Sequence, residues 1–159
     1  MGAKAEELAR KFEAKAREAT AILNGLSDAE WKTITAAEKW SVGVTAHHVA
    51  GAHEPIANIA KTLASGQSIP HFTMSMLDEM NAKHAQEFAG CSKAETMALH
   101  EKGAAAAGAV VRALSDEQLT RSGPVLAGNP PMTVEQVITG ILIHHIDDHY
   151  GSIRKTIGR

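Results

Sequence analysis

The sequence predicts an all-α fold in which four main helices, with short extra helices between them, form a bundle. The composition is rich in Ala, Glu, Lys and Leu, and only 4% of the residues are aromatic, which favours helices over sheets. Apolar residues recur at steps of three and four through several long segments, and no segment alternates as a strand does. A chain of 159 residues suits one core, so we expect a single domain over residues 1–159.

Charge and cysteine content exclude several classes of protein. The net charge is −2 with neutral histidines, which offers no electrostatic footprint for nucleic acid or an anionic membrane. Cys91 is the only cysteine, so a disulfide framework is excluded. Lys4 and Glu6 stand where a signal peptide would be apolar, and no uncharged run approaches the ~18 residues that span a bilayer. These observations predict a cytoplasmic protein that binds neither nucleic acid nor membrane.

The first helix is expected over residues 3–25, because an apolar stripe runs along one face and Gly25 is placed to end it. Ser27-Asp28-Ala29-Glu30 has the pattern of a capping box and predicts a short helical turn. Ser41 is placed to cap a second helix over residues 42–64.

The second helix contains a proline. Pro55 removes the hydrogen bond to the carbonyl of Gly51, so we expect a kink near residues 51–55. The kink has two interpretations, a bend that keeps a long helix wrapped around the bundle, or a functional feature close to His48 and His53.

Residues 71–90 predict a third helix, which Gly90 ends. From Ser92 the chain either starts a new helix or continues the third one with a bend, as far as Leu114. The small side chains at residues 103–111 would permit a close approach between helices.

The last helix is expected to start at the capping box Thr133-Val134-Glu135-Gln136, after a loop at residues 122–131 that holds two glycines and three prolines. One face of it, expected to be buried, carries Ile138, Ile141, His145, His149 and Ser152.

Two histidines on that face predict a metal site. His145 and His149 are one turn apart, the spacing at which two helical imidazoles bind one ion, and a buried imidazole needs a partner for its nitrogens. His144 is excluded from the pair, because it lies five positions from His149. A third ligand must come from another helix of the bundle.

The second helix offers His47, His48 and His53 as that third ligand. Its apolar positions predict a buried face on which His48 lies, formed by Val44, Ala52, Ile56, Ile59 and Leu63. We therefore choose His48.

The alternative for each histidine alone is a core residue bonded to a carbonyl. This alternative is preferred for His53, His71, His84 and His100, of which His53 is the best placed to line a pocket. The roles of His47, His53 and His144 are left open. Two acidic residues have candidate roles, Asp148 as a hydrogen-bond acceptor for a ligand imidazole and Glu54 as a general base, but a solvated position is favoured for Asp148.

Two segments resemble the DinB/YfiT-like superfamily. They are Trp40-Ser41-Val42-Gly43-Val44-Thr45-Ala46-His47-His48 and His145-Ile146-Asp147-Asp148-His149-Tyr150-Gly151-Ser152. The family has a Trp-Ser/Thr-Val segment with a histidine eight residues after the tryptophan, and a His-x-x-x-His pair on its last helix. The resemblance implies an up-down-down-up four-helix bundle with three metal ligands, here His48, His145 and His149. Members often carry Arg-Gly-Gln after the second histidine of the pair, where this sequence has Tyr150-Gly151-Ser152.

Three neutral imidazoles suit Zn²⁺ or Ni²⁺ and leave a coordination position open. The resemblance implies a metal-dependent enzyme, a hydrolase or an S-transferase that uses a low-molecular-weight thiol with a small-molecule substrate. The alternatives are a metal-binding or stress-response protein without turnover, and a helical dimerisation module with structural histidines. A homodimer is expected, since Ala-rich faces occur on the helices. Because protons compete for imidazoles of pKa near ~6.5, metal affinity is expected to fall steeply below about pH 6.

Overall fold

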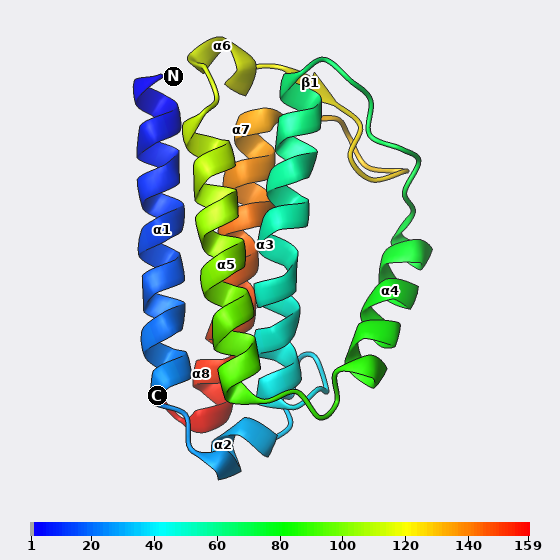
Figure 1. The fold of residues 1–159 in the computed structure, drawn as a ribbon. Coiled ribbons are helices and arrows are strands. Elements are labelled where there is room, and N and C mark those ends of the chain that lie inside the picture. The colour runs from blue at the N-terminus through cyan, green and yellow to red at the C-terminus, as the bar shows by residue number, and fades with distance from the viewer. Residues whose placement is uncertain (1) are drawn as a thin grey trace.

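Four long helical segments form the bundle, as predicted. In the computed structural model, which describes residues 2–159, they are α1 (Ala3–Asn24), α3 (Val42–Ala64), α5 (Lys93–Arg112) and a last segment made of α7 (Val134–Val137), η1 (Ile138–Ile143) and α8 (His144–Ile157). Helix α1 runs opposite to α3, α3 and α5 run in the same direction, and the last segment runs back (Figure 1). This is the up-down-down-up connectivity that the resemblance implies.

Short elements close the ends of the bundle. Helices α2 (Asp28–Lys32) and α6 (Asp116–Leu119) both begin with complete capping boxes, in which Ser27 pairs with Glu30 and Ser115 with Gln118. Strands β1 (Ser122–Gly123) and β2 (Met132–Thr133) form one antiparallel pair, with Ser122 opposite Thr133. The sequence does not reveal this pair, because two residues are too few to show an alternating pattern.

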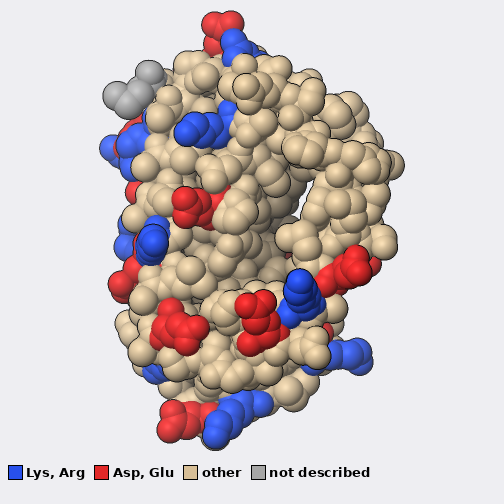
Figure 2. All heavy atoms as spheres, turned by 45° about the vertical axis from the view of Figure 1, so that its right-hand side comes forward, with Lys and Arg blue, Asp and Glu red and all other residues tan. Residues whose placement is uncertain are grey.

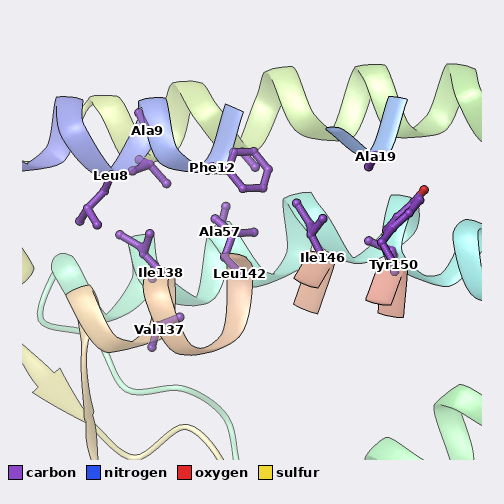
Figure 3. Packing of buried hydrophobic residues seen from close by; sticks show 14 of the residues in the cluster. Leu8, Ala9, Phe12, Ala19, Ala57, Val137, Ile138, Leu142, Ile146 and Tyr150 are labelled. Carbon is purple, nitrogen blue, oxygen red and sulfur yellow. The ribbon is translucent and has the colours of Figure 1, made fainter. Parts of the chain in front are cut away.

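The core lies between α1, α3, α5 and the last segment. Phe12 on α1 and Leu142, Ile146 and Tyr150 on the last segment point into it (Figure 3). Helices α3 and α5 approach closely at Gly103, where an added Cβ would lie 3.0 Å from the backbone carbonyl oxygen of Ala50. The expectation of close packing at residues 103–111 is therefore confirmed.

The third predicted helix has a different place from the one expected. Helix α4 (Met74–Glu87) has no buried residue and stands beside the bundle as a strap, and α5 takes the third place in the bundle (Figure 1). The chain reverses after Phe88, and the side chain of Ser92 caps α5 by accepting the N–H of Glu95. Of the two alternatives for this region, a new helix after Ser92 is correct.

The last helix contains an irregular turn, and its buried face differs from the one expected. Residues Ile138–Ile143 form a π-helix, which a periodicity of 3.6 residues does not foresee. The buried stripe of this segment runs through Ile138, Leu142, Ile146, Tyr150 and Ile153. The expectation that His145 and His149 lie on the buried stripe is therefore wrong: both are partly exposed, on the neighbouring face.

Helix α3 is continuous across Pro55, whose ring is exposed beside the exposed Gly51. The kink expected at residues 51–55 stays a prediction. Within residues 2–159, none of the helices combines the length and apolar character needed to cross a bilayer.

Candidate metal centre

Three histidines from two helices converge beside the core. One ring nitrogen from each of His48 on α3 and His145 and His149 on α8 lies within 4.8 Å of the other two. The Nε2 atoms of His48 and His145 are 3.0 Å apart, and the ring centroids of His145 and His149 are 4.6 Å apart. The three residues chosen from the sequence are thus brought together, and their role as metal ligands stays a prediction.

Helical spacing places the cluster at the edge of the core. On α3, His48, Ala52, Ile56 and Ile59 share a partly exposed face, and the buried line of this helix runs instead through Val49, His53, Ala57 and Ala60. The face assigned to His48 is therefore adjacent to the core, which corrects the expectation of a fully buried face. The cluster therefore lies between the core and the surface of the bundle.

Glu38 orients His149, and the sequence analysis missed it. Its carboxylate accepts the Nδ1–H of His149 at 2.7 Å and the hydroxyl of Ser152 at 2.6 Å, and its side chain is only 8% exposed. A hydrogen on Nδ1 leaves the lone pair on Nε2, the arrangement that metal-bound histidines usually have. Asp148, the acceptor considered from the sequence, is exposed, so its expected solvation is confirmed.

A tight turn places Glu38 over α8. Thr35 N–H donates to the carbonyl of Trp40 at 2.8 Å, and Lys39 N–H donates to the carbonyl of Thr35 at 3.0 Å. Lys39 has a φ of 63°, a left-handed conformation that is uncommon outside glycine. The one sequence signal for Glu38 is its place two residues before Trp40, whose ring packs edge-on against His48 at 5.2 Å.

Burial keeps two of the three imidazoles neutral. Desolvation, with the neighbouring His149 second, lowers the pKa of His48 to about 4 and that of His145 to about 2. For Glu38, burial acts to raise the pKa, but the hydrogen bonds from Ser152 and His149 act against it, and the pKa lies below its ordinary value. The steep loss of metal affinity below pH 6 that the sequence predicts assumes ordinary histidine pKa values, so we now expect a shallower decline.

The donor set fits a divalent ion. The 3.0 Å between the Nε2 atoms of His48 and His145 is close to the roughly 3.3 Å between two ligands of tetrahedral zinc with bonds of ~2.0–2.1 Å. Nδ1 of His145 is buried and finds no hydrogen-bond partner among residues 2–159, so this ring is left with an unsatisfied nitrogen whichever tautomer it takes.

The remaining histidines lie outside the cluster. His53 and His100 form a buried pair with 3.0 Å between Nε2 and Nδ1, and His100 Nε2–H donates to the carbonyl of Ala16 at 3.0 Å. The idea that His53 lines the pocket is therefore wrong, and the ordinary core role preferred for it is correct. His144 and His71 are exposed.

His47 also differs from its expected place on the flank of the helix. It is only 5% exposed and bonds through Nδ1 to Nε2 of His84 on α4 at 2.8 Å. Glu54, the candidate general base, lines a separate cavity between α3 and α5 together with Leu99 and Lys102, and none of the three clustered histidines lines it.

The buried pair of His53 and His100 makes stability depend on pH. Burial lowers the pKa of both rings, that of His53 to about 3, below the ~6.5 of an unfolded histidine. Their contribution is complete above about pH 6.5 and is lost as the pH falls, so between pH 7 and pH 5 His53 alone should cost about 2 kcal/mol of unfolding free energy.

Urea unfolding at pH 7 and pH 5 measures this effect. His53→Gln, which keeps a donor toward His100, should reduce the loss, and the exposed His71→Gln should leave it unchanged. An equal loss in the wild type and in His53→Gln would contradict the assignment.

The fold and the cluster together define a class of protein: helical bundles in which three histidines converge at the edge of the core. The model of the DinB superfamily matches residues 11–153, so the chain belongs to this superfamily. No curated protein sequence matches it significantly.

Solved structures share the fold. Mycothiol-dependent maleylpyruvate isomerase superposes with a TM-score of 0.74 at 15% identity, over 94% of this chain and 60% of the other, and a mutant of that enzyme gives 0.75 at 14% over the same shares. YfiT from Bacillus subtilis, described as a probable metal-dependent hydrolase with an unusual four-helix bundle topology, gives 0.70 at 19% over 98% and 86%. The chain thus spans about 60% of the isomerase, and these likenesses establish the fold alone.

Proposed function

We propose that this chain is a metal-dependent enzyme, a thiol-dependent S-transferase or a hydrolase, in which His48, His145 and His149 hold one divalent ion. The observation that carries the proposal is the convergence of three ring nitrogens within 4.8 Å. Three imidazoles favour Zn²⁺ or Ni²⁺ and leave a position open to a small molecule.

In this proposal the bound ion, the two uncharged histidines and Glu38 have different roles. The ion, when bound, would lower the pKa of a water molecule or of a thiol at the open position. Burial keeps His48 and His145 uncharged at neutral pH, which is the protonation state that a ligand requires. Glu38 holds the Nδ1 proton of His149 and so directs Nε2 inward.

A low-molecular-weight thiol is proposed as the cosubstrate. The support is that one structural neighbour is named as mycothiol-dependent and another as a probable metal-dependent hydrolase. The partly exposed edge on which the histidines lie gives such a molecule access. The homodimer, the cytoplasmic location and the single domain over residues 1–159 stay predictions.

Metal titration tests the proposal. Protein prepared without a histidine tag should bind one Zn²⁺ or Ni²⁺ per chain, measured by calorimetry and elemental analysis. Cobalt-substituted protein should then develop a thiolate-to-cobalt absorption band when a small thiol such as 2-mercaptoethanol is added.

The outcomes separate the functions. Binding of metal without a thiol band, and without any displacement of the ion's water by small anions, would favour a metal-binding protein without turnover. Absence of metal binding would leave the 3.0 Å contact between His48 and His145 as a structural hydrogen bond and would favour an interaction module.

A further inference from the structure

Hydrogen bonds tie helix α4 to the bundle near its C-terminal end, and tie the residue pair before its N-terminus to the loop between β1 and β2. Near its C-terminal end, Nε2 of His84 lies 2.8 Å from Nδ1 of His47. Just before its N-terminal end, the carbonyl of Phe72 accepts the N–H of Ala127 at 2.8 Å. For the chain from residue 2 onward, no side-chain hydrogen bond or ion pair joins residues 74–81 to another element.

A hollow lies between this strap and the bundle (Figure 2). The side of α4 that carries His84 also carries Leu77, which is partly buried, and Met74 and Met80 on either side of it. Met74 is 53% exposed and Met80 is 56% exposed. Apolar side chains thus share the side of α4 that bears His84, and two of them are more than half exposed.

The face of α3 that bears His48 carries apolar side chains as well. Ala52, Ile56 and Ile59 continue the face of α3 that starts at His48, and Ile141 precedes His145 by one turn. Ile56, Ile59 and Ile141 pack against the core and remain partly exposed.

The absence of charge at the named positions on both sides indicates which kind of ligand fits. Neither the three positions on α4 nor the four on the bundle include a Lys, Arg, Asp or Glu. Walls without charge favour an uncharged hydrocarbon, because a charged group would lose its hydration without gaining a partner. Unbranched methionine side chains adapt to apolar groups of different shape. The rows on α3 and on η1 and α8 meet at His48 and His145, which contact each other, so the apolar walls lead to the histidine cluster.

We propose that the hollow under α4 binds the uncharged hydrocarbon part of a small-molecule ligand, with Met74, Leu77 and Met80 on one side and Ile56, Ile59 and Ile141 on the other. The polar end of the same molecule is directed to the histidine cluster, and this orientation rests on the proposed function. Binding of the hydrocarbon part does not need the metal.

Methionine-methyl NMR on metal-free protein tests the proposal with 1-octanol as the probe. The methyl signals of Met74 and Met80, assigned with Met→Leu variants, should shift to saturation, whereas the signal of Met97 on α5 should not. Glucose, a polar probe, should shift none of them. Equal shifts of all the methionines, or none with 1-octanol, would overturn the proposal.

A charge placed in the hollow provides the second measurement. Met80→Glu should weaken 1-octanol binding about tenfold or more, because the carboxylate would have to be desolvated. Gln86→Glu adds the same group to the exposed outer side of α4 and should leave binding unchanged. Equal affinity of the two variants would overturn the proposal.

The metal titration is independent of these results. Octanol binding without metal binding would refute the proposed function and retain the apolar site. Metal binding without octanol-induced shifts would retain the proposed function and refute the apolar site.

Discussion

His145→Ala is expected to abolish tight metal binding, with a loss of affinity well beyond the ~10–100-fold that an outer hydrogen-bond partner contributes. Nδ1 of His145 is buried, and its Nε2 lies 3.0 Å from that of His48. Without it, His48 and His149 remain as two ligands from different helices, which is fewer than the three that an open site requires. Calorimetric titration with Zn²⁺ measures the loss.

His144→Ala is the matched control. It removes the same side chain one position earlier on the same helix, but His144 is exposed and lies outside the cluster. Its affinity for Zn²⁺ should equal that of the wild type. If His145→Ala and His144→Ala bind Zn²⁺ equally well, the cluster is not the metal site.

Glu38→Gln should lower the affinity for Zn²⁺ by about 10–100-fold without changing the stoichiometry. A glutamine can still accept the Nδ1–H of His149 and can donate to the Ser152 hydroxyl, so the hydrogen bonds are kept in number. The negative charge is lost, and with it the polarisation that makes His149 a stronger ligand. The comparison therefore isolates the charge of the carboxylate from its geometry.

Asp148→Asn makes the same chemical change next to His149 on the exposed side of α8. It should leave Zn²⁺ affinity unchanged within error. The melting temperatures of the metal-free variants should also be compared, because Glu38 joins the turn at residues 35–40 to α8. A drop in metal affinity for Asp148→Asn as large as that for Glu38→Gln would show that general electrostatics, and not the hydrogen bond to His149, is responsible.

The chain positions of the three clustered histidines were accessible to reasoning from the sequence. His145 and His149 are one helical turn apart, and this relation is local, so it survives any arrangement of the helices. The face that predicts His48 is only partly buried, but its place eight residues after Trp40 points to the same residue, and the structure brings it together with His145 and His149. The start of three of the four main segments was also local, since Ser41, Ser92 and Thr133 cap their helices through hydrogen bonds within four residues.

Glu38 and the histidine pairs required the tertiary structure. Glu38 and His149 are 111 positions apart, and His53 and His100 are 47 apart, so no periodicity relates them. The position of α4 is a further case, because its stripe of Leu77, Met80 and His84 is the pattern of a helix packed in a bundle. Whether such a stripe is covered depends on which helix takes the third place in the bundle. Here α5 takes that place, and α4 stands beside the bundle.

By itself, the sequence determined the helical class, the ends of the main helices and the three histidines, because capping and helical spacing act within a few residues. The tertiary structure alone decided that His145 and His149 lie beside the buried stripe of a segment that contains a π-helix, that Glu38 orients His149, and that a hollow lies between α4 and the bundle. These features depend on contacts between distant segments, and such contacts are selected by how the whole chain packs and not by local preference.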